Sequence, residues 1–383
     1  MKRSFLSLTL TLLFLLTSLT ACAPQNHVGV DSSGLDPFVI GGIGPLTSET
    51  ESYSTSVLQG AQLAVDEINA TGGVNGFRLV LNFQDSKGNP ETAVNVYEKL
   101  KSNGMKVLLG GVFSDETAAL AEASEEDGML IVTPTAGEKI LPESTKNLFR
   151  VCIDSPRLGT AAAEFVLGNE SDTAAVVYSD DPFGGDEISQ AFLSVFAERG
   201  ATAFRYSVTP DTDLTEIFTE LNVKRYDTVF LALSSQDTED FLAGYDGDSE
   251  LLSVNPPADP VANDGLAVIS SFFNGEDNSV MNNFTESYEA AYHVVPDRYA
   301  ADAYDAVYAV AEAIKRAGVN PENADNADTN ERLVDAMTKI DVNGVTGKIS
   351  WTANGENNRN PSVRILKDGI YVPYTTEFER KKS

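Results

Sequence analysis

Short apolar runs and amphipathic segments alternate along the chain from Pro37 onward. The run FVIGGI at 38–43 is followed by a segment whose apolar residues recur at the 3.6-residue spacing of a helix and which closes at Gly72 and Gly73. The same alternation continues with strands expected at 78–85, 106–111 and 129–133 and helices expected at 91–102 and 115–127. This pattern predicts an α/β fold in which parallel sheets are covered by helices on both faces.

A second series of the same kind begins after residue 154. It predicts helices at 158–168, 186–199, 214–223 and from about 237, with strands at 173–181, 203–210, 227–235 and 266–273. The stretch 246–265 is acidic and rich in turn residues, and it is expected to be a surface loop. Only the turn at 154–156 separates the two series, which indicates two α/β cores joined by a hinge. Further helices are expected at 279–293, 299–317 and 329–339, followed by short strands at 347–351, 362–366 and 369–374.

The N-terminal segment has the pattern of an export signal. Lys2 and Arg3 precede an apolar stretch at 5–19, and Leu-Thr-Ala-Cys follows, ending at Cys22. This ending resembles the lipobox of bacterial lipoproteins, which implies cleavage after residue 21 and diacylation of Cys22; an uncleaved membrane anchor is the alternative. Residues 22–36 are small and polar, as in a flexible tether. We therefore expect an exported protein, lipid-anchored to the outer face of the cell membrane.

The charge balance restricts the possible partners. The chain has 57 acidic and 27 basic residues, and removal of residues 1–21 leaves 25 basic ones and a net charge of −32. Such an acidic surface argues against binding to nucleic acid and against adsorption to anionic lipid. With Cys22 lipidated, Cys152 has no partner, so the fold must be stabilised by packed cores rather than by disulfides.

The ordered set of motifs resembles one known family. Its pieces are the stretch from Ile40 to Val94, and then GGVFSDETAALAEASEEDGMLIVTPTA, FRVCIDSPRLG, DDPFGGD, DRYAADAYDAVYAVAEAI and GVTGKISWTANGE. Together they resemble periplasmic-type solute-binding proteins of the branched-chain amino acid kind, which serve ABC importers. The resemblance implies two Rossmann-like lobes with three crossings and a ligand in the cleft between them. It places lobe one at 37–154 plus 276–351 and lobe two at 155–275 plus 352–379.

The resemblance also implies which turns of lobe one hold the ligand. In GGVFSDET, Ser114 and the amides of the helix that follows would meet a ligand carboxylate, as helix N-termini do with anions; the alternative is that Ser114 is an ordinary helix cap. In TPTAGEK, the positions of Thr135, Ala136 and Gly137 would offer backbone groups. The hydroxyl common at the third place is missing at Gly137, and Thr135 is the alternative source of one. Tyr53 matches an aromatic cover over the ligand, or it packs on the first helix as a surface tyrosine.

In lobe two the chain departs from the amino acid binders. Phe183 stands where tyrosine is usual, and Ser234 stands where an aromatic residue is often found. The acid that holds the ligand ammonium is replaced by Ser-Phe-Phe ending at Phe273, with Phe272 at the matching place. Either another acid reaches the cleft, or the ligand has no ammonium, because burying an unpaired ammonium is costly. The candidate acids are Asp180, Asp181, Asp237 and Glu49.

Convergence of aromatic side chains would favour an aromatic or apolar acid, or an amide, as ligand. The rings concerned are those of Phe113, Phe183, Phe272 and Tyr53. Asp115 and Glu116 would repel a carboxylate ligand if they faced the cleft. We expect both to point outward and to stabilise the helix through its dipole.

No catalytic motif accompanies these features. The chain has no Gly-x-Ser-x-Gly, no His-Glu-x-x-His, no phosphate-binding loop and no metal-spaced Cys/His cluster. We therefore expect a monomeric, non-enzymatic protein without cofactor or metal, whose partners are a small solute and the permease and ATPase subunits of an importer. The alternative is a ligand-sensing receptor subunit that presents solute to a separate signalling protein.

Overall fold

The computed structural model describes residues 34–48, 51–139, 145–179, 184–257, 259–274 and 279–374. The chain divides into two compact units, Met1–Leu35 and Asp36–Ser383, and every element below belongs to the second unit. The export signal, the lipidation site Cys22 and most of the tether lie outside the described residues. Within the described residues, no helix is long and apolar enough to cross a membrane.

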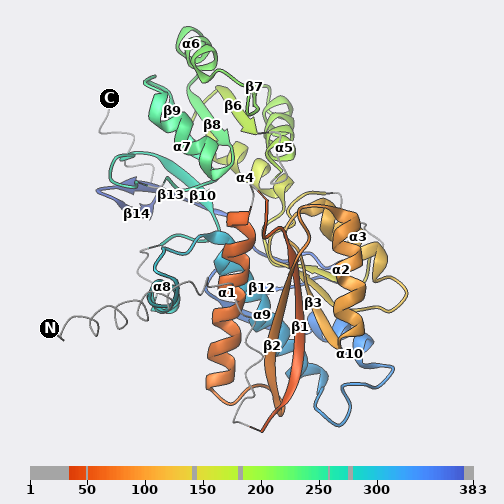
Figure 1. The fold of residues 1–383 in the computed structure, drawn as a ribbon. Coiled ribbons are helices and arrows are strands. Elements are labelled where there is room, and N and C mark those ends of the chain that lie inside the picture. Colours follow the sequence, from red (N-terminus) through yellow and green to blue (C-terminus); the bar gives the residue numbers. More distant parts are fainter. Residues whose placement is uncertain are drawn as a thin grey trace, which may run out of the picture. The chain divides into compact units, whose positions relative to one another are not determined.

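The first sheet has five parallel strands in the order β2-β1-β3-β4-β5. Figure 1 labels β1, β2 and β3 of this sheet. The strands are β1 (Asp36–Gly44), β2 (Phe77–Asp85), β3 (Met105–Gly111), β4 (Ile131–Thr133) and β5 (Leu148–Arg150). Strands β1, β3, β4 and β5 are mostly buried, as expected for parallel strands covered on both faces, whereas the edge strand β2 is only partly buried.

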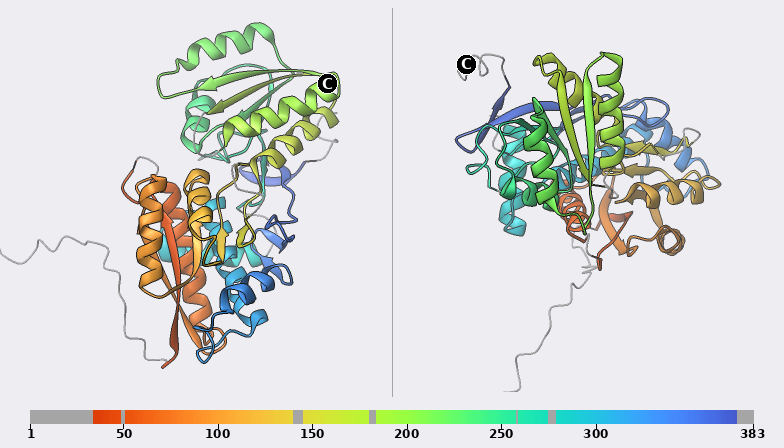
Figure 2. Two further views of the ribbon diagram at one scale, coloured as in Figure 1. Left: turned by 90° about the vertical axis from the view of Figure 1, so that its right-hand side faces the viewer. Right: turned by 90° about the horizontal axis from the view of Figure 1, so that it is seen from above.

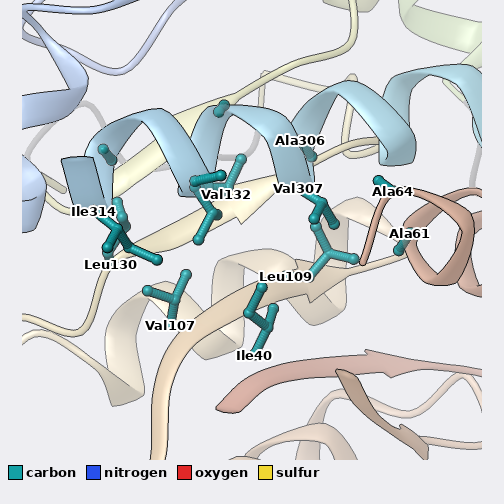
Figure 3. Packing of buried hydrophobic residues seen from close by; sticks show 14 of the residues in the cluster. Ile40, Ala61, Ala64, Val107, Leu109, Leu130, Val132, Ala306, Val307 and Ile314 are labelled. Carbon is teal, nitrogen blue, oxygen red and sulfur yellow. The ribbon is translucent and has the colours of Figure 1, made fainter. Parts of the chain in front are cut away.

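Two pairs of helices cover this sheet. On one face lie α1 (Glu51–Ala70) and α9 (Arg298–Ala317), and on the other lie α2 (Pro90–Ser102) and α3 (Ser114–Ala123). Figure 3 shows the packing of the first pair on the strands, with labelled residues Ala61, Ala64, Ala306, Val307 and Ile314 from the helices and Ile40, Val107, Leu109, Leu130 and Val132 from the sheet. Close approach of α1 and α9 requires Gly60, because a Cβ there would lie 2.0 Å from the Ala300 carbonyl oxygen. Two further helices, α8 (Ser279–Tyr292) and α10 (Thr329–Met337), pack beside α9.

The second sheet has seven strands in the order β14-β13-β10-β9-β8-β6-β7. Five of them run parallel, β6 (Thr173–Ser179), β7 (Thr202–Val208), β8 (Thr228–Ala232), β9 (Glu250–Ser253) and β10 (Ala267–Ser270). Strand β13 (Ser362–Lys367) pairs antiparallel with both β10 and β14 (Ile370–Pro373). The helices of this half are α4 (Ser155–Gly168), α5 (Gly185–Glu198), α6 (Leu214–Lys224) and α7 (Ser235–Gly244). Figure 2 shows helices along both sheets, which confirms the predicted α/β class with two doubly wound sheets.

The structure corrects the prediction for residues 246–265. This stretch was expected to be a surface loop, but its residues Glu250–Ser253 form β9, an interior strand of the second sheet. The strand has only four residues and is flanked by turn residues, so no periodicity can be read from it. A small hairpin consists of β11 (Asp341–Gly344) and β12 (Gly347–Ser350). The strand predicted at 347–351 corresponds to β12, whereas β11 was not predicted. The lobe boundaries at 154/155, 275/276 and 351/352 stay a prediction.

Candidate functional site

The strand order of the first sheet predicts where a ligand binds. The chain leaves β1 for α1 on one face of the sheet, and it leaves β3 for α3 on the other face. The carboxyl ends of β1 and β3 therefore mark the topological switch point, where open α/β sheets bind ligands. The glycines that end these strands allow close packing there: a Cβ at Gly44 would lie 2.5 Å from a Val112 methyl group, and one at Gly111 would lie 2.9 Å from the Glu116 Cβ.

Ser114 begins α3 but does not cap it. The N-cap residue is Phe113, which makes no side-chain capping bond, so the alternative of an ordinary serine cap is wrong. The buried Ser114 hydroxyl instead accepts a hydrogen bond of 3.2 Å from the Glu138 amide in the next turn of the sheet. Ser114 thus fastens the turn after β3 to the turn after β4.

The turn after β4 is held by a further set of hydrogen bonds. The Thr135 hydroxyl donates to the Val112 carbonyl at 2.7 Å, and the Ala136 amide donates to the Thr133 hydroxyl at 3.1 Å. The Gly137 carbonyl accepts from the Ser155 amide at 2.8 Å, at the start of α4. The two predicted turns of lobe one are therefore tied to each other and to the first residue of α4.

A small cavity lies where these turns meet α4 and α9. Its volume is about 20 Å³, which is room for about one water molecule and too little for an amino acid. Of the predicted residues, Thr135 and Gly137 line it. The remaining wall comes from Pro134, Cys152, Ile153, Ser155, Leu158, Ser270, Ser271, Arg298, Tyr299 and Asp302.

Tyr53 packs against α9 beside this cavity. Its ring meets that of Tyr299 edge to face, with centroids 5.0 Å apart, and Tyr299 lines the cavity whereas Tyr53 does not. The half-buried Tyr53 also packs against the core cluster that contains Phe113. Its position fits both interpretations made from the sequence, a cover over a ligand and a tyrosine that packs on a helix.

The structure does not bring Phe272 into an aromatic wall with Phe113 and Tyr53. Phe272 is buried in a different cluster, where its ring meets Phe284 of α8 edge to face at 5.8 Å. The apolar faces of α8 and α9 draw the ring away, and the serines before it, Ser270 and Ser271, line the cavity instead. Phe183 lies outside the described residues.

Ser234 caps α7, the helix that follows strand β8 of the second sheet. Its hydroxyl accepts from the Asp237 amide at 3.1 Å and donates to the Asp237 carboxylate at 2.8 Å. The Ser234 amide in turn donates to the Ser179 hydroxyl at 2.8 Å. Asp237, one of the candidate acids, thus already has a partner in its own helix turn, and neither residue lines the cavity. The other candidates, Glu49, Asp180 and Asp181, lie outside the described residues.

Glu116 corrects the expectation that both first-turn acids of α3 point outward. Asp115 is exposed, but the Glu116 side chain is fully buried. The Ser86 hydroxyl and the Phe113 amide lie near its carboxylate, but neither oxygen has a hydrogen bond of good geometry among the described residues. Burial is the main cause that raises the pKa of Glu116 to about 7. This carboxyl therefore holds its proton to a higher pH than an exposed glutamate does.

A group of charged residues in and beside the cavity wall was not predicted from the sequence. Asp302 of α9 pairs with Arg359 at 2.8 Å, and Arg359 also donates to the Val151 carbonyl and the Thr346 hydroxyl. One turn further along α9, Asp305 accepts from the Val345 and Thr346 amides at 2.8 and 3.0 Å. A signal was present, because the motif DRYAADAYD sets charged residues four and three positions apart on an alanine-rich helix.

Other chemistry at the cavity is limited. Burial raises the pKa of the Cys152 thiol to about 12, which keeps it protonated and unreactive at neutral pH. Among the residues that the structure describes, no group of three His, Cys, Asp or Glu side chains is placed to hold a metal ion.

Comparison with known proteins agrees with this architecture. A family model described as periplasmic binding protein matches residues 37–366. The Leu/Ile/Val-binding protein BraC3 of Rhizobium johnstonii is 28% identical over 370 residues, which cover 90% of this chain and 94% of that protein. A leucine-binding protein from Thermotoga maritima has a similar structure, with a TM-score of 0.72 at 22% identity over 88% of this chain and 98% of its own.

A second solved structure carries a different ligand. It is a solute-binding protein of an ABC transporter from R. palustris in complex with benzoate, with a TM-score of 0.74 at 21% identity over 88% of this chain and 95% of its own. At identities of 21% and 22%, the similarity to these two structures shows the fold alone. The family model matches residues 37–366 and therefore shows the family as well. The chain belongs to the periplasmic binding protein family.

Proposed function

We propose that the chain is an exported lipoprotein that captures a small organic solute between its two lobes and delivers it to an ABC importer. The observation that carries the proposal is the meeting of five segments at one cavity: the turn after β4, the segment after β5, the carboxyl end of β10, and the starts of α4 and α9. Relatives named for binding leucine, isoleucine and valine, and a structural neighbour with benzoate, support a solute of amino acid or small-acid size.

The mechanism that fits this site is closure around the solute. The cavity of about 20 Å³ cannot hold an amino acid or benzoate, so binding requires the surrounding segments to separate and close again. The segments that run between the two sheets, at 151–154 and 271–274, line the cavity or flank it, so a bound solute contacts the hinge itself. A solute that contacts both lobes stabilises the closed state, which a permease can recognise.

A thermal-shift screen of the chain without residues 1–21 tests the binding proposal. The compounds are amino acids, aromatic and aliphatic acids, their amides and short peptides. A ligand at 100 times its Kd stabilises the fold by about 2.7 kcal/mol, which gives a clear rise in melting temperature. A folded, cooperatively melting protein that no compound stabilises would contradict the proposal.

The anchor and the importer are tested in cells. Replacement of Cys22 by Ser should release the protein from the membrane fraction without changing solute affinity, because the anchor is separate from the site.

The alternative role is that of a receptor subunit that presents solute to a signalling protein. It predicts that deletion of the gene for this protein leaves solute uptake unchanged and abolishes the response of the cells to the solute. Loss of uptake on deletion would support transport.

A further inference from the structure

We propose that the solute is a small carboxylate without an amino group, and that Arg298 is the residue that selects it. This inference rests on the proposed solute-binding function and narrows the class of solute. It depends on the charges in the cavity wall.

The cavity lining contains two charged side chains, Arg298 and Asp302. Asp302 is not free to pair with a solute, because its carboxylate lies 2.8 Å from the Arg359 guanidinium and both side chains are 4% exposed. One carboxylate therefore stands near two guanidinium groups. Arg298 is the charge in this lining that has no carboxylate of the described residues within ion-pair distance.

The contacts of Arg298 leave it available to an anion. One guanidinium nitrogen donates to the Tyr299 hydroxyl at 2.8 Å, and the group lies over the Tyr299 ring at 4.7 Å. Its Nε is buried and has no hydrogen-bond partner among the described residues, and no carboxylate of those residues lies within 4.0 Å of it. The adjacent Asp297 uses its carboxylate elsewhere, accepting from the Ala300 amide at 2.9 Å and the Ser56 hydroxyl at 2.8 Å.

A half-buried guanidinium with an unpaired N–H favours a carboxylate, which accepts charge-assisted hydrogen bonds. The helix ends at the cavity act in the same direction. Ser155 begins α4 and Arg298 begins α9, so two helix N-termini, each with partial positive charge, border the cavity. Both features stabilise a negative group.

An ammonium group finds no such partner in the described lining. The one carboxylate there, Asp302, is already paired, and Asp237 is hydrogen-bonded within its own turn. An amino acid would bring a positive charge next to Arg298 without a free acid to neutralise it. The described wall thus fits a carboxylate whose other end is neutral.

The experiment compares matched compounds by calorimetry on the chain without residues 1–21. The pairs are leucine with 4-methyl-2-oxopentanoate, phenylalanine with 3-phenylpropanoate, and benzamide with benzoate. We expect the carboxylate without an amino group to bind more tightly in the pair whose skeleton fits. Arg298→Gln should weaken that binding by about 10- to 100-fold, the equivalent of one charged hydrogen bond, and Arg298→Lys should restore part of it.

The matched control is Arg316→Gln, an exposed arginine on the same helix, which should leave affinity unchanged. Tighter binding of an amino acid or of benzamide would overturn the inference and leave the proposed function intact. Equal affinity of the wild type and a folded Arg298→Gln variant would overturn the role of Arg298. Binding of no compound in this set or in the thermal-shift screen would contradict the proposed function as well.

Discussion

The Asp302 carboxylate lies 2.8 Å from the Arg359 guanidinium, and both side chains are almost completely buried. Arg359 follows the small β11–β12 hairpin, whereas Asp302 lies in α9, so the pair joins segments 57 residues apart. The same guanidinium bonds to the Val151 carbonyl, where the chain leaves the first sheet. One buried ion pair therefore holds together α9 and two of the segments that connect the sheets.

Replacement of Arg359 by Leu should lower the free energy of unfolding by about 3–5 kcal/mol, because it leaves the buried Asp302 carboxylate unpaired. The double variant Asp302→Leu with Arg359→Leu should recover part of this loss. Urea unfolding of the three proteins at pH 7 measures the effect. A loss below about 1 kcal/mol in the single variant would show that the ion pair does not stabilise the hinge.

Two glycines of α4 provide a matched test of helix packing. A Cβ at Gly159 would lie 2.1 Å from the Ile188 carbonyl oxygen of α5, whereas a Cβ at Gly168 would meet nothing within 4 Å. Gly159→Ala should therefore destabilise the fold by about 1–3 kcal/mol through overpacking. Gly168→Ala should be neutral or stabilising by up to about 1 kcal/mol. Similar melting temperatures of the two variants would contradict the close α4–α5 contact.

Glu116 should make the free energy of unfolding fall as the pH rises from 4.5 to about 7. Burial raises its pKa from an ordinary 4.5 to about 7 in the folded state. Below pH 4.5 both the folded and the unfolded state hold the proton; between pH 4.5 and 7 the unfolded state loses it first, so stability is lost over that range. A shift of this size corresponds to roughly 3 kcal/mol.

Glu116→Gln keeps the shape of the side chain and removes the titration. Relative to the wild type, the variant should gain stability between pH 5 and pH 8, measured by urea unfolding at both values. The comparison cancels the contribution of Asp305, whose pKa burial also raises, to about 6. If the stability difference between variant and wild type is the same at both pH values, Glu116 does not titrate in this range.

Ser114→Ala tests the role of the first turn in solute binding. The variant loses a hydroxyl that fastens the Glu138 amide and that we expect to meet the solute. One lost hydrogen bond of about 1 kcal/mol should raise the Kd roughly 5-fold and leave the fold intact. Ser235→Ala, at the first position of α7 and exposed, is the matched control and should not change affinity. An unchanged Kd in Ser114→Ala would limit this serine to a structural role.

The regular elements could be predicted from the sequence because their periodicity is strong. Helix α9 is an example: its apolar residues Val307, Ala311 and Ile314 repeat at helical spacing, and all three are buried in the first core. Strand β9 could not be predicted, because four residues carry no period and only the neighbouring strands β8 and β10 make them a strand.

The site was harder to predict than the fold. The turns after β3 and β4 could be named from their motifs, but the direction of a side chain depends on its surroundings. Glu116 points inward, where the Ser86 hydroxyl lies near its carboxylate, and Phe272 points away because α8 and α9 offer an apolar surface. Arg298 and Asp302 lie one helical turn apart on α9, but Arg359 reaches Asp302 only through a tertiary contact with a segment that is distant in the sequence.

Closure of the protein around one solute is the central claim, and small-angle X-ray scattering tests it most directly. The measurement compares the chain without residues 1–21, alone and saturated with the tightest solute from the screen, with stoichiometry fixed by calorimetry. We predict one solute per chain and a smaller radius of gyration in the bound state. Tight one-to-one binding with an unchanged scattering curve would contradict closure.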